Sequence, residues 1–172
     1  MELSIADIKQ KVGAAYDFDV EEKVEGLEFK GERIDFVAPV RVNGRVENLG
    51  KKLFGVTGVI HAVIEDQCYR CLTKTRVDLK IDFNFKFSES PEKHKDEEDE
   101  VFPIEEDVIK LDTPVINEII LNLPSKVLCS PDCRGFCPYC GVDLNSGECR
   151  CKGTKVDPRL RVLEKLLDTN ND

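Results

Sequence analysis

The sequence predicts an α+β fold, in which an antiparallel β-sheet of about five strands carries a packed helix, a C-terminal zinc-knuckle lobe and a closing C-terminal helix. Three observations predict it. Apolar and polar residues alternate along several runs in the first half of the chain, as in strands with one buried face. Two helical patterns that start at proline follow, and six of the eight cysteines cluster between residues 129 and 151.

The first element expected in chain order is a short helix over residues 4–11. Ile5, Ile8 and Val12 are spaced to share one helical face, and Ser4 is placed to cap the helix. Glycine follows at position 13 and ends the pattern.

Strands of one sheet are expected next. Tyr16, Phe18 and Val20 alternate with acidic residues, and the same parity holds over residues 34–46. The unbroken alternation favours one long, kinked strand there, although Asn43-Gly44 is also a good hairpin turn. Residues 53–66 and 77–87 form two further runs, and the second alternates most cleanly. Short turns without crossover helices imply antiparallel pairing.

Residues 88–107 are expected to form an acidic surface loop. The part from Glu89 to Asp107 holds ten acidic residues and two lysines, which give it −8 of the chain's net charge of −9. A solvated loop is the simplest interpretation. The alternative is an arm that engages a basic partner.

Helices are expected after this loop. Thr113-Pro114 is a cap followed by proline at the first helical position, and Pro124 ends the apolar stripe that should pack on the sheet. Asp157-Pro158 begins a second helix in the same way. The predicted organisation is therefore a sheet domain over residues 1–124 and a zinc-binding lobe with its helix over residues 125–172.

The chain carries no membrane or export signal that we recognise. Charged residues interrupt the first twelve positions, and no run approaches the roughly 20 apolar residues of a spanning helix. We expect a cytoplasmic protein without a membrane partner. Thiols stay reduced in that compartment, so clustered cysteines favour a metal over disulfides.

The cysteine spacing predicts four-thiolate zinc coordination. Cys137 and Cys140 enclose Pro-Tyr and precede a glycine, which is a zinc knuckle in outline, and Cys149 and Cys151 are its natural partners. The remaining cysteines allow two arrangements: a second site made by Cys68, Cys71, Cys129 and Cys133, or a single site chosen from the six clustered cysteines with the upstream pair free.

Catalytic uses of these thiols are poorly supported. Redox Cys-x-x-Cys motifs open a helix within a βαβ pattern, and neither pair has that setting. A hydrolytic zinc keeps an open position and usually has histidine or carboxylate ligands. The two histidines are His61, expected on a strand, and His94, in the acidic loop. We therefore expect no enzyme activity and no small-molecule substrate.

At this point the motifs resemble those of the YceD family, whose members are described as large ribosomal RNA subunit accumulation proteins. The resemblance is tightest from Pro124 to Leu163. It rests on four segments: Cys68-Tyr69-Arg70-Cys71-Leu72, residues 117–124, Cys129 to Asn145 with its Cys133-Arg134-Gly135-Phe136-Cys137 core, and Asp157-Pro158-Arg159-Leu160. In some members of the family the later cysteines are sparser, while ligand-type residues match the upstream pair and Cys129 and Cys133; this resemblance favours two sites.

The resemblance implies a factor for the accumulation of 23S ribosomal RNA or for ribosome assembly, with ribosomal RNA or a pre-ribosomal large subunit as partner. The lobe is weakly basic, because eight basic residues face five acidic ones between Lys126 and Lys165. Six of the basic residues are the predicted phosphate contacts: Arg134, Arg150, Lys152, Lys155, Arg159 and Arg161. The alternative function is an adaptor that holds a basic ribosomal protein through the acidic loop.

Overall fold

The computed structural model describes residues 1–29, 31–94 and 100–151. The chain divides into two compact units, Met1–Pro131 and Asp132–Asp172. All of the helices and strands assigned in the described residues belong to the first unit.

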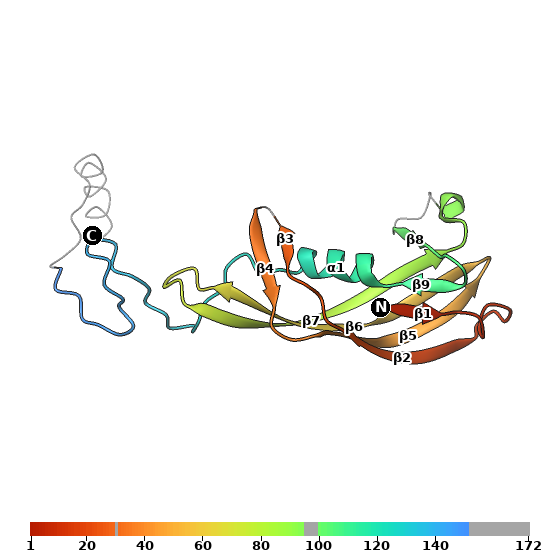
Figure 1. The fold of residues 1–172 in the computed structure, drawn as a ribbon, viewed down its shortest axis with the longest axis horizontal. Coiled ribbons are helices and arrows are strands. Elements are labelled where there is room, and N and C mark those ends of the chain that lie inside the picture. Colours follow the sequence, from red (N-terminus) through yellow and green to blue (C-terminus); the bar gives the residue numbers. More distant parts are fainter. Residues whose placement is uncertain (30, 95–99, 152–172) are drawn as a thin grey trace, which may run out of the picture. The chain divides into compact units, whose positions relative to one another are not determined.

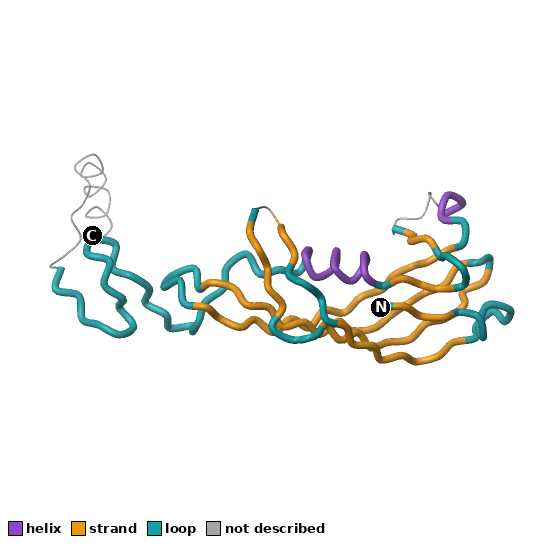
Figure 2. The backbone as a smooth tube through the Cα atoms, viewed as in Figure 1, coloured by secondary structure: helices purple, strands orange, loops and turns teal. Residues whose placement is uncertain are grey.

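The first unit is built mainly from β-strands, shown as arrows in Figure 1 and in orange in Figure 2. Its strands are β1 (Glu2–Ser4), β2 (Ala15–Glu22), β3 (Leu27–Phe29), β4 (Glu32–Phe36), β5 (Val40–Gly50), β6 (Leu53–Gln67), β7 (Lys74–Ser88), β8 (Val101–Pro103) and β9 (Val108–Lys110). A 3-10 turn, η1 (Pro91–His94), and one α-helix, α1 (Asp112–Leu121), complete the described elements.

Seven strands form the main sheet, and β1 pairs with β9 in a separate two-stranded sheet. The long strand β6 organises the main sheet, because β7 pairs along its full length while β5 and β4 share its other edge. All of these pairings are antiparallel, and only the short β8 runs parallel to its neighbour β7. The prediction of an antiparallel sheet is confirmed, but about five strands was too few, since three-residue strands such as β3 and β8 leave little pattern in a sequence.

The hairpin alternative at Asn43-Gly44 is wrong. Both residues lie within β5, where Gly44 pairs with Gly58 of β6 and with Phe18 of β2. The single long strand is also interrupted, because residues 37–39 separate β4 from β5. Pro39 has no N–H to donate to a sheet ladder, which favours a break at that point.

The predicted alternation buries one face of the main sheet. Val42, Val46, Ile60 and Phe87 lie in the core, whereas Arg41, His61 and Lys80 form one exposed row across β5, β6 and β7. In Figure 1, α1 lies over one face of this sheet, and its Val115 and Ile119 are buried in the same core. The prediction of a packed helix is therefore confirmed in part, since the described residues contain one short α-helix beside the sheet.

The helix predicted for residues 4–11 is absent, and the chain forms successive turns there. Ile5 and Ile8 are buried as the pattern suggested, but Val12 is 69% exposed. The buried amide of Asn48 explains the difference, because its Nδ2 donates to the carbonyls of Ile8 and Lys9 at 2.8 and 2.9 Å. The carbonyls of Ile8 and Lys9 thus already accept hydrogen bonds from β5, and they need no N–H donor from a helix.

The start of α1 also differs from the prediction. The helix begins at Asp112 with Leu111 at the cap position, so Thr113 is not the cap and no side chain supplies a capping bond. Pro114 still lies in the first turn, where its missing N–H costs nothing. The second predicted helix, from Asp157, lies outside the described residues.

The acidic segment is held at both ends by lysines. Lys9 Nζ contacts Glu89 at 2.7 Å and also Asp107, and Lys52 Nζ lies 2.6 Å from Glu89. Between these ends the structure describes η1 and β8. Within the described parts of the chain, no helix is long and apolar enough to cross a membrane.

Candidate metal centres

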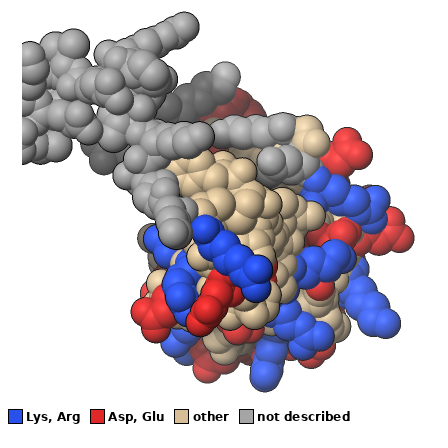
Figure 3. Space-filling view, turned by 90° about the vertical axis from the view of Figure 1, so that its left-hand side faces the viewer, with Lys and Arg blue, Asp and Glu red and all other residues tan. Residues whose placement is uncertain are grey.

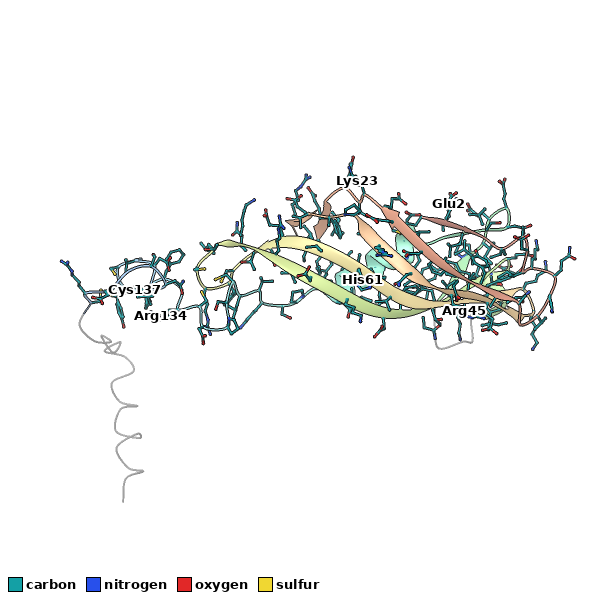
Figure 4. All side chains as sticks on the ribbon, turned by 90° about the horizontal axis from the view of Figure 1, so that it is seen from below. Glu2, Lys23, Arg45, His61, Arg134 and Cys137 are labelled. Carbon is teal, nitrogen blue, oxygen red and sulfur yellow. The ribbon has the colours of Figure 1, made fainter. Side chains whose placement is uncertain are left out.

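The sulfur atoms of the eight cysteines gather into two groups of four, and within each group they lie no more than 4.8 Å from one another. The first group contains Cys68, Cys71, Cys129 and Cys133, and the second contains Cys137, Cys140, Cys149 and Cys151. This grouping is the two-site partition expected from the sequence, and Cys68 and Cys71 belong to the first group. Figure 4 draws the sulfur atoms in yellow.

The first pair is positioned by the turn between β6 and β7. The N–H of Cys68 donates to the carbonyl of Thr73 at 2.9 Å, and that of Leu72 donates to the carbonyl of Cys68 at 2.8 Å. Leu72 adopts a left-handed φ of 57°, which closes the turn. Both cysteines are buried. The turn therefore holds two thiols close together at one end of the hairpin.

The chain after α1 meets this turn. The N–H of Tyr69 donates to the carbonyl of Val127 at 2.8 Å, which holds the segment leading to Cys129 beside the hairpin. As a result, Cys129 Sγ lies 3.5 Å from Cys71 Sγ. Residues that are far apart in the sequence thus supply ligands to one group.

The surroundings of the first pair favour thiolates. Burial is the largest single influence on Cys68 and raises its pKa, but backbone hydrogen bonds from Cys129, Arg70 and Cys71 together outweigh it and bring the pKa to about 6. The hydroxyl of Thr73, 3.3 Å from Cys71 Sγ, is the first cause of a lowered pKa for Cys71. Donors that stabilise a thiolate also favour a thiolate ligand.

The second group is built on the predicted knuckle. The N–H of Cys137 donates to the carbonyl of Val142 at 2.8 Å, and that of Gly141 donates back to the carbonyl of Cys137 at 2.9 Å. Gly141 has φ of 72°, a conformation that glycine adopts without strain. Cys149 Sγ lies 3.3 Å from Cys137 Sγ and 3.7 Å from Cys140 Sγ. The later pair therefore closes the site as the spacing predicted.

Protons are held unequally within the second group. Backbone hydrogen bonds from Cys140 and Tyr139 lower the pKa of Cys137 to about 6, whereas the neighbouring thiols of Cys149 and Cys140 raise that of Cys151 to about 12. Cys137 therefore loses its proton more readily than Cys151 does. A divalent cation at the centre of the four sulfurs would favour the thiolate form of each cysteine, including Cys151.

Both groups have the dimensions of a metal cage. Four sulfurs placed about 2.3 Å from a central zinc lie about 3.8 Å from one another. One sulfur–sulfur distance in the first group and two in the second, of 3.3 to 3.7 Å, are close to this value, and they are well beyond the roughly 2.05 Å of a disulfide. None of the eight cysteines forms a disulfide. Two closed metal sites are therefore the arrangement that these residues fit best.

Asn145 supports the cysteines, a role that the sequence analysis did not predict. Its Oδ1 accepts the N–H of Arg134 at 2.8 Å, and its Nδ2 lies 3.5 Å from Cys133 Sγ. The same Nδ2 also donates to Asp143 Oδ1 at 2.9 Å. The side chain thus fixes the loop around a cysteine. Only its place in the Asp143-x-Asn145 turn motif was a signal.

Of the predicted phosphate contacts, Arg134 and Arg150 are exposed in the second unit, and Figure 4 labels Arg134. Lys152, Lys155, Arg159 and Arg161 lie outside the described residues. Figure 3 shows Lys and Arg interspersed with Asp and Glu on one end of the molecule, without a broad patch of one sign. His61 is an exposed strand residue and belongs to neither cysteine group.

The chain is similar to known sequences over most of its length. The family model described as "Large ribosomal RNA subunit accumulation protein YceD" matches residues 56–167. Uncharacterized protein Rv2926c of Mycobacterium tuberculosis (strain H37Rv) is 33% identical over 179 residues, which cover 100% of this chain and 84% of the relative. Uncharacterized protein YlbN of Bacillus subtilis (strain 168) is 28% identical, covering 100% and 99%. No solved structure matches.

Proposed function

The chain belongs to the YceD family, and from this premise we propose that it is a non-enzymatic, zinc-binding factor that supports the accumulation of 23S ribosomal RNA or the assembly of the large ribosomal subunit. It acts in the cytoplasm by binding ribosomal RNA or a pre-ribosomal particle. The observation that carries the proposal is the pair of four-sulfur groups, because all eight cysteines fall inside the segment that matches the family.

Zinc is the metal that suits these groups. Thiolates are soft ligands, and tetrahedral sites made of four sulfurs hold zinc or iron–sulfur clusters. The knuckle at Cys137 and Cys140, paired with Cys149 and Cys151, has the short spacing of zinc ribbons. Zinc would hold these segments together as a structural element. Zinc does not change oxidation state, so the site needs no electron donor or acceptor.

The same coordination supports a non-enzymatic role. Catalytic zinc keeps an open position for water or substrate, whereas four protein sulfurs fill the tetrahedron. The first pair lies on a strand-to-strand turn and not at the start of a helix, which is the setting that activates redox Cys-x-x-Cys thiols. Metal binding therefore explains the arrangement of the cysteines better than catalysis does.

We assign RNA contact to the basic residues of the second unit, namely Arg134, Arg150, Lys152, Lys155, Arg159 and Arg161. The adaptor alternative has less support, because three acidic residues of the segment, Glu89, Glu105 and Asp107, already pair with lysines of the chain. Glu89 contacts Lys9 and Lys52, and Glu105 contacts Lys110 at 2.5 Å. These contacts leave fewer carboxylates for a basic protein.

The test is co-sedimentation with large-subunit precursor particles. We expect the chain to co-sediment at low salt and to dissociate as salt rises, because phosphate contacts release counterions. Arg134→Glu combined with Arg150→Glu should weaken co-sedimentation at least tenfold, and Lys23→Glu, an equal charge change at an exposed position on the first unit, should change it little.

Two outcomes would contradict the proposal: co-sedimentation that is absent, or co-sedimentation that does not respond to salt. Deleting residues 89–107 separates the two functions, since an adaptor would lose its partner while an RNA-binding factor should bind as well or better.

A further inference from the structure

The turn that carries Cys68 and Cys71 also exposes a tyrosine, and we propose that Tyr69 is a stacking platform for an unpaired base of RNA. This inference rests on the proposed function and locates a second contact for the same partner, on the first unit. Tyr69 is 67% exposed, and Leu72 and Leu128 beside the turn are 62% and 36% exposed. Large apolar side chains so exposed on a rigid turn indicate a binding surface.

The backbone under the ring is fixed. Tyr69 donates its N–H to Val127, and the residues on either side of the turn are joined by the Cys68–Thr73 and Leu72–Cys68 backbone hydrogen bonds. The cysteine next to Tyr69 belongs to the first four-sulfur group. A ring on such a support loses little conformational entropy when a base stacks on it.

A lysine orders the ring and adds positive charge. Lys126 Nζ lies 5.0 Å from the centre of the Tyr69 ring, which is within the range of a cation–π contact. An ammonium on one face leaves the exposed part of the ring for a base, and the same ammonium can contact the phosphate that follows that base. Aromatic rings combined with cations are the usual means of binding single-stranded nucleic acid.

The local charge favours an anionic partner, although the whole chain is acidic. Arg70 is exposed beside Tyr69, and Lys126 lies over the ring. Of the acidic residues at this end of the hairpin, Glu65 is paired with Lys74 at 2.6 Å. The basic side chain that lies over the ring is therefore the one placed to contact an RNA phosphate.

The size of the surface favours RNA over protein. The exposed turn consists of Tyr69, Arg70 and Leu72, with Lys126 and Leu128 beside it. Stable protein interfaces use roughly 20–30 residues on each side, whereas one base needs only one ring face. A single-stranded RNA fits this surface better than a folded protein does.

Fluorescence provides a direct test, because the chain has no tryptophan. We expect Tyr69→Trp in the full chain to emit fluorescence that a 12-nucleotide single-stranded RNA quenches, since the base stacks on the indole. The same sequence in a duplex should quench less, because paired bases are not free to stack. Leu121→Trp is the control: this position is 78% exposed on α1 and should show little quenching.

Affinity for the single-stranded RNA provides the second readout. Tyr69→Leu should weaken binding about ten- to a hundredfold, and Tyr69→Phe, which keeps the ring, should restore most of it. Metal content is measured for each variant, so that a loss of binding is attributed to the ring only where the metal is retained.

Several results would overturn the inference. One is unchanged affinity in Tyr69→Leu while the unaltered chain binds RNA, which leaves the proposed function intact. Another is quenching of Trp fluorescence at position 69 by RNA-free ribosomal proteins and not by RNA, which would assign the turn to a protein partner. A failure of the unaltered chain to bind any RNA would remove the proposed function as well.

Discussion

Removal of zinc by a chelator is expected to unfold residues 132–151 and to leave the main sheet folded. In this part of the second unit only Cys133, Gly135 and Cys137 are buried, so no apolar core supports it. Binding of structural zinc to such small segments contributes about 10–16 kcal/mol, which is also their folding free energy. The sheet of the first unit instead has a continuous core that includes Phe54, Phe87 and Ile119.

Amide hydrogen exchange measures this difference residue by residue. With zinc bound, the N–H groups of Cys137 and Gly141 should be protected, since both donate within the knuckle. Chelation should abolish their protection and open the Cys68–Thr73 turn, while the amides of β6 away from the turn stay protected. A chelator saturated with zinc beforehand is the control. Protection of Cys137 and Gly141 that survives zinc removal would show that the second unit folds without metal.

Gly58→Ala is expected to destabilise the first unit by about 3 kcal/mol or more. Gly58 of β6 lies opposite Gly44 of β5. A Cβ added to Gly58 would lie 2.2 Å from the carbonyl oxygen of Asn43 and 2.7 Å from the Cα of Gly44. Because both contacts are backbone atoms, the strands themselves would have to separate. Phe18 and Phe83 pair with the two glycines from β2 and β7, so a separation would disturb the core as well.

Urea unfolding gives the free energy of unfolding for each variant. Thr57→Ala is the matched control, because Thr57 precedes Gly58 on the same strand and its side chain is exposed. We expect this variant to change stability by less than about 1 kcal/mol. Equal stability of Gly58→Ala and the unaltered chain would mean that β5 and β6 do not approach as closely as the structure shows.

The sequence predicted the sheet well because its signal is local. Alternation over β2, β6 and β7 depends only on which residues face the core. It does not depend on which strands lie beside each of them. The failures arose where distant residues decide the conformation. The amide of Asn48 takes the carbonyls that a helix at residues 4–11 would have used, and the approach of Gly44 to Gly58 makes Asn43-Gly44 part of a strand.

The metal groups were predictable for a similar reason. Cys137, Cys140, Cys149 and Cys151 are close in sequence, and the spacing alone brings them together. The joining of Cys68 and Cys71 to the later pair required the resemblance to the family as well, because about sixty residues intervene. The supporting roles of Asn145 and Tyr69 could not be derived from spacing, since both depend on neighbours that the fold supplies.

Zinc stoichiometry tests the central claim most directly, with each cysteine pair changed in turn. We predict two zinc ions per unaltered chain, measured by elemental mass spectrometry on purified protein. The Cys68→Ser, Cys71→Ser variant should keep one zinc, held by the second group, and the Cys137→Ser, Cys140→Ser variant should keep one, held by the first. A single zinc per chain that is unaffected by the loss of Cys68 and Cys71 would contradict the account.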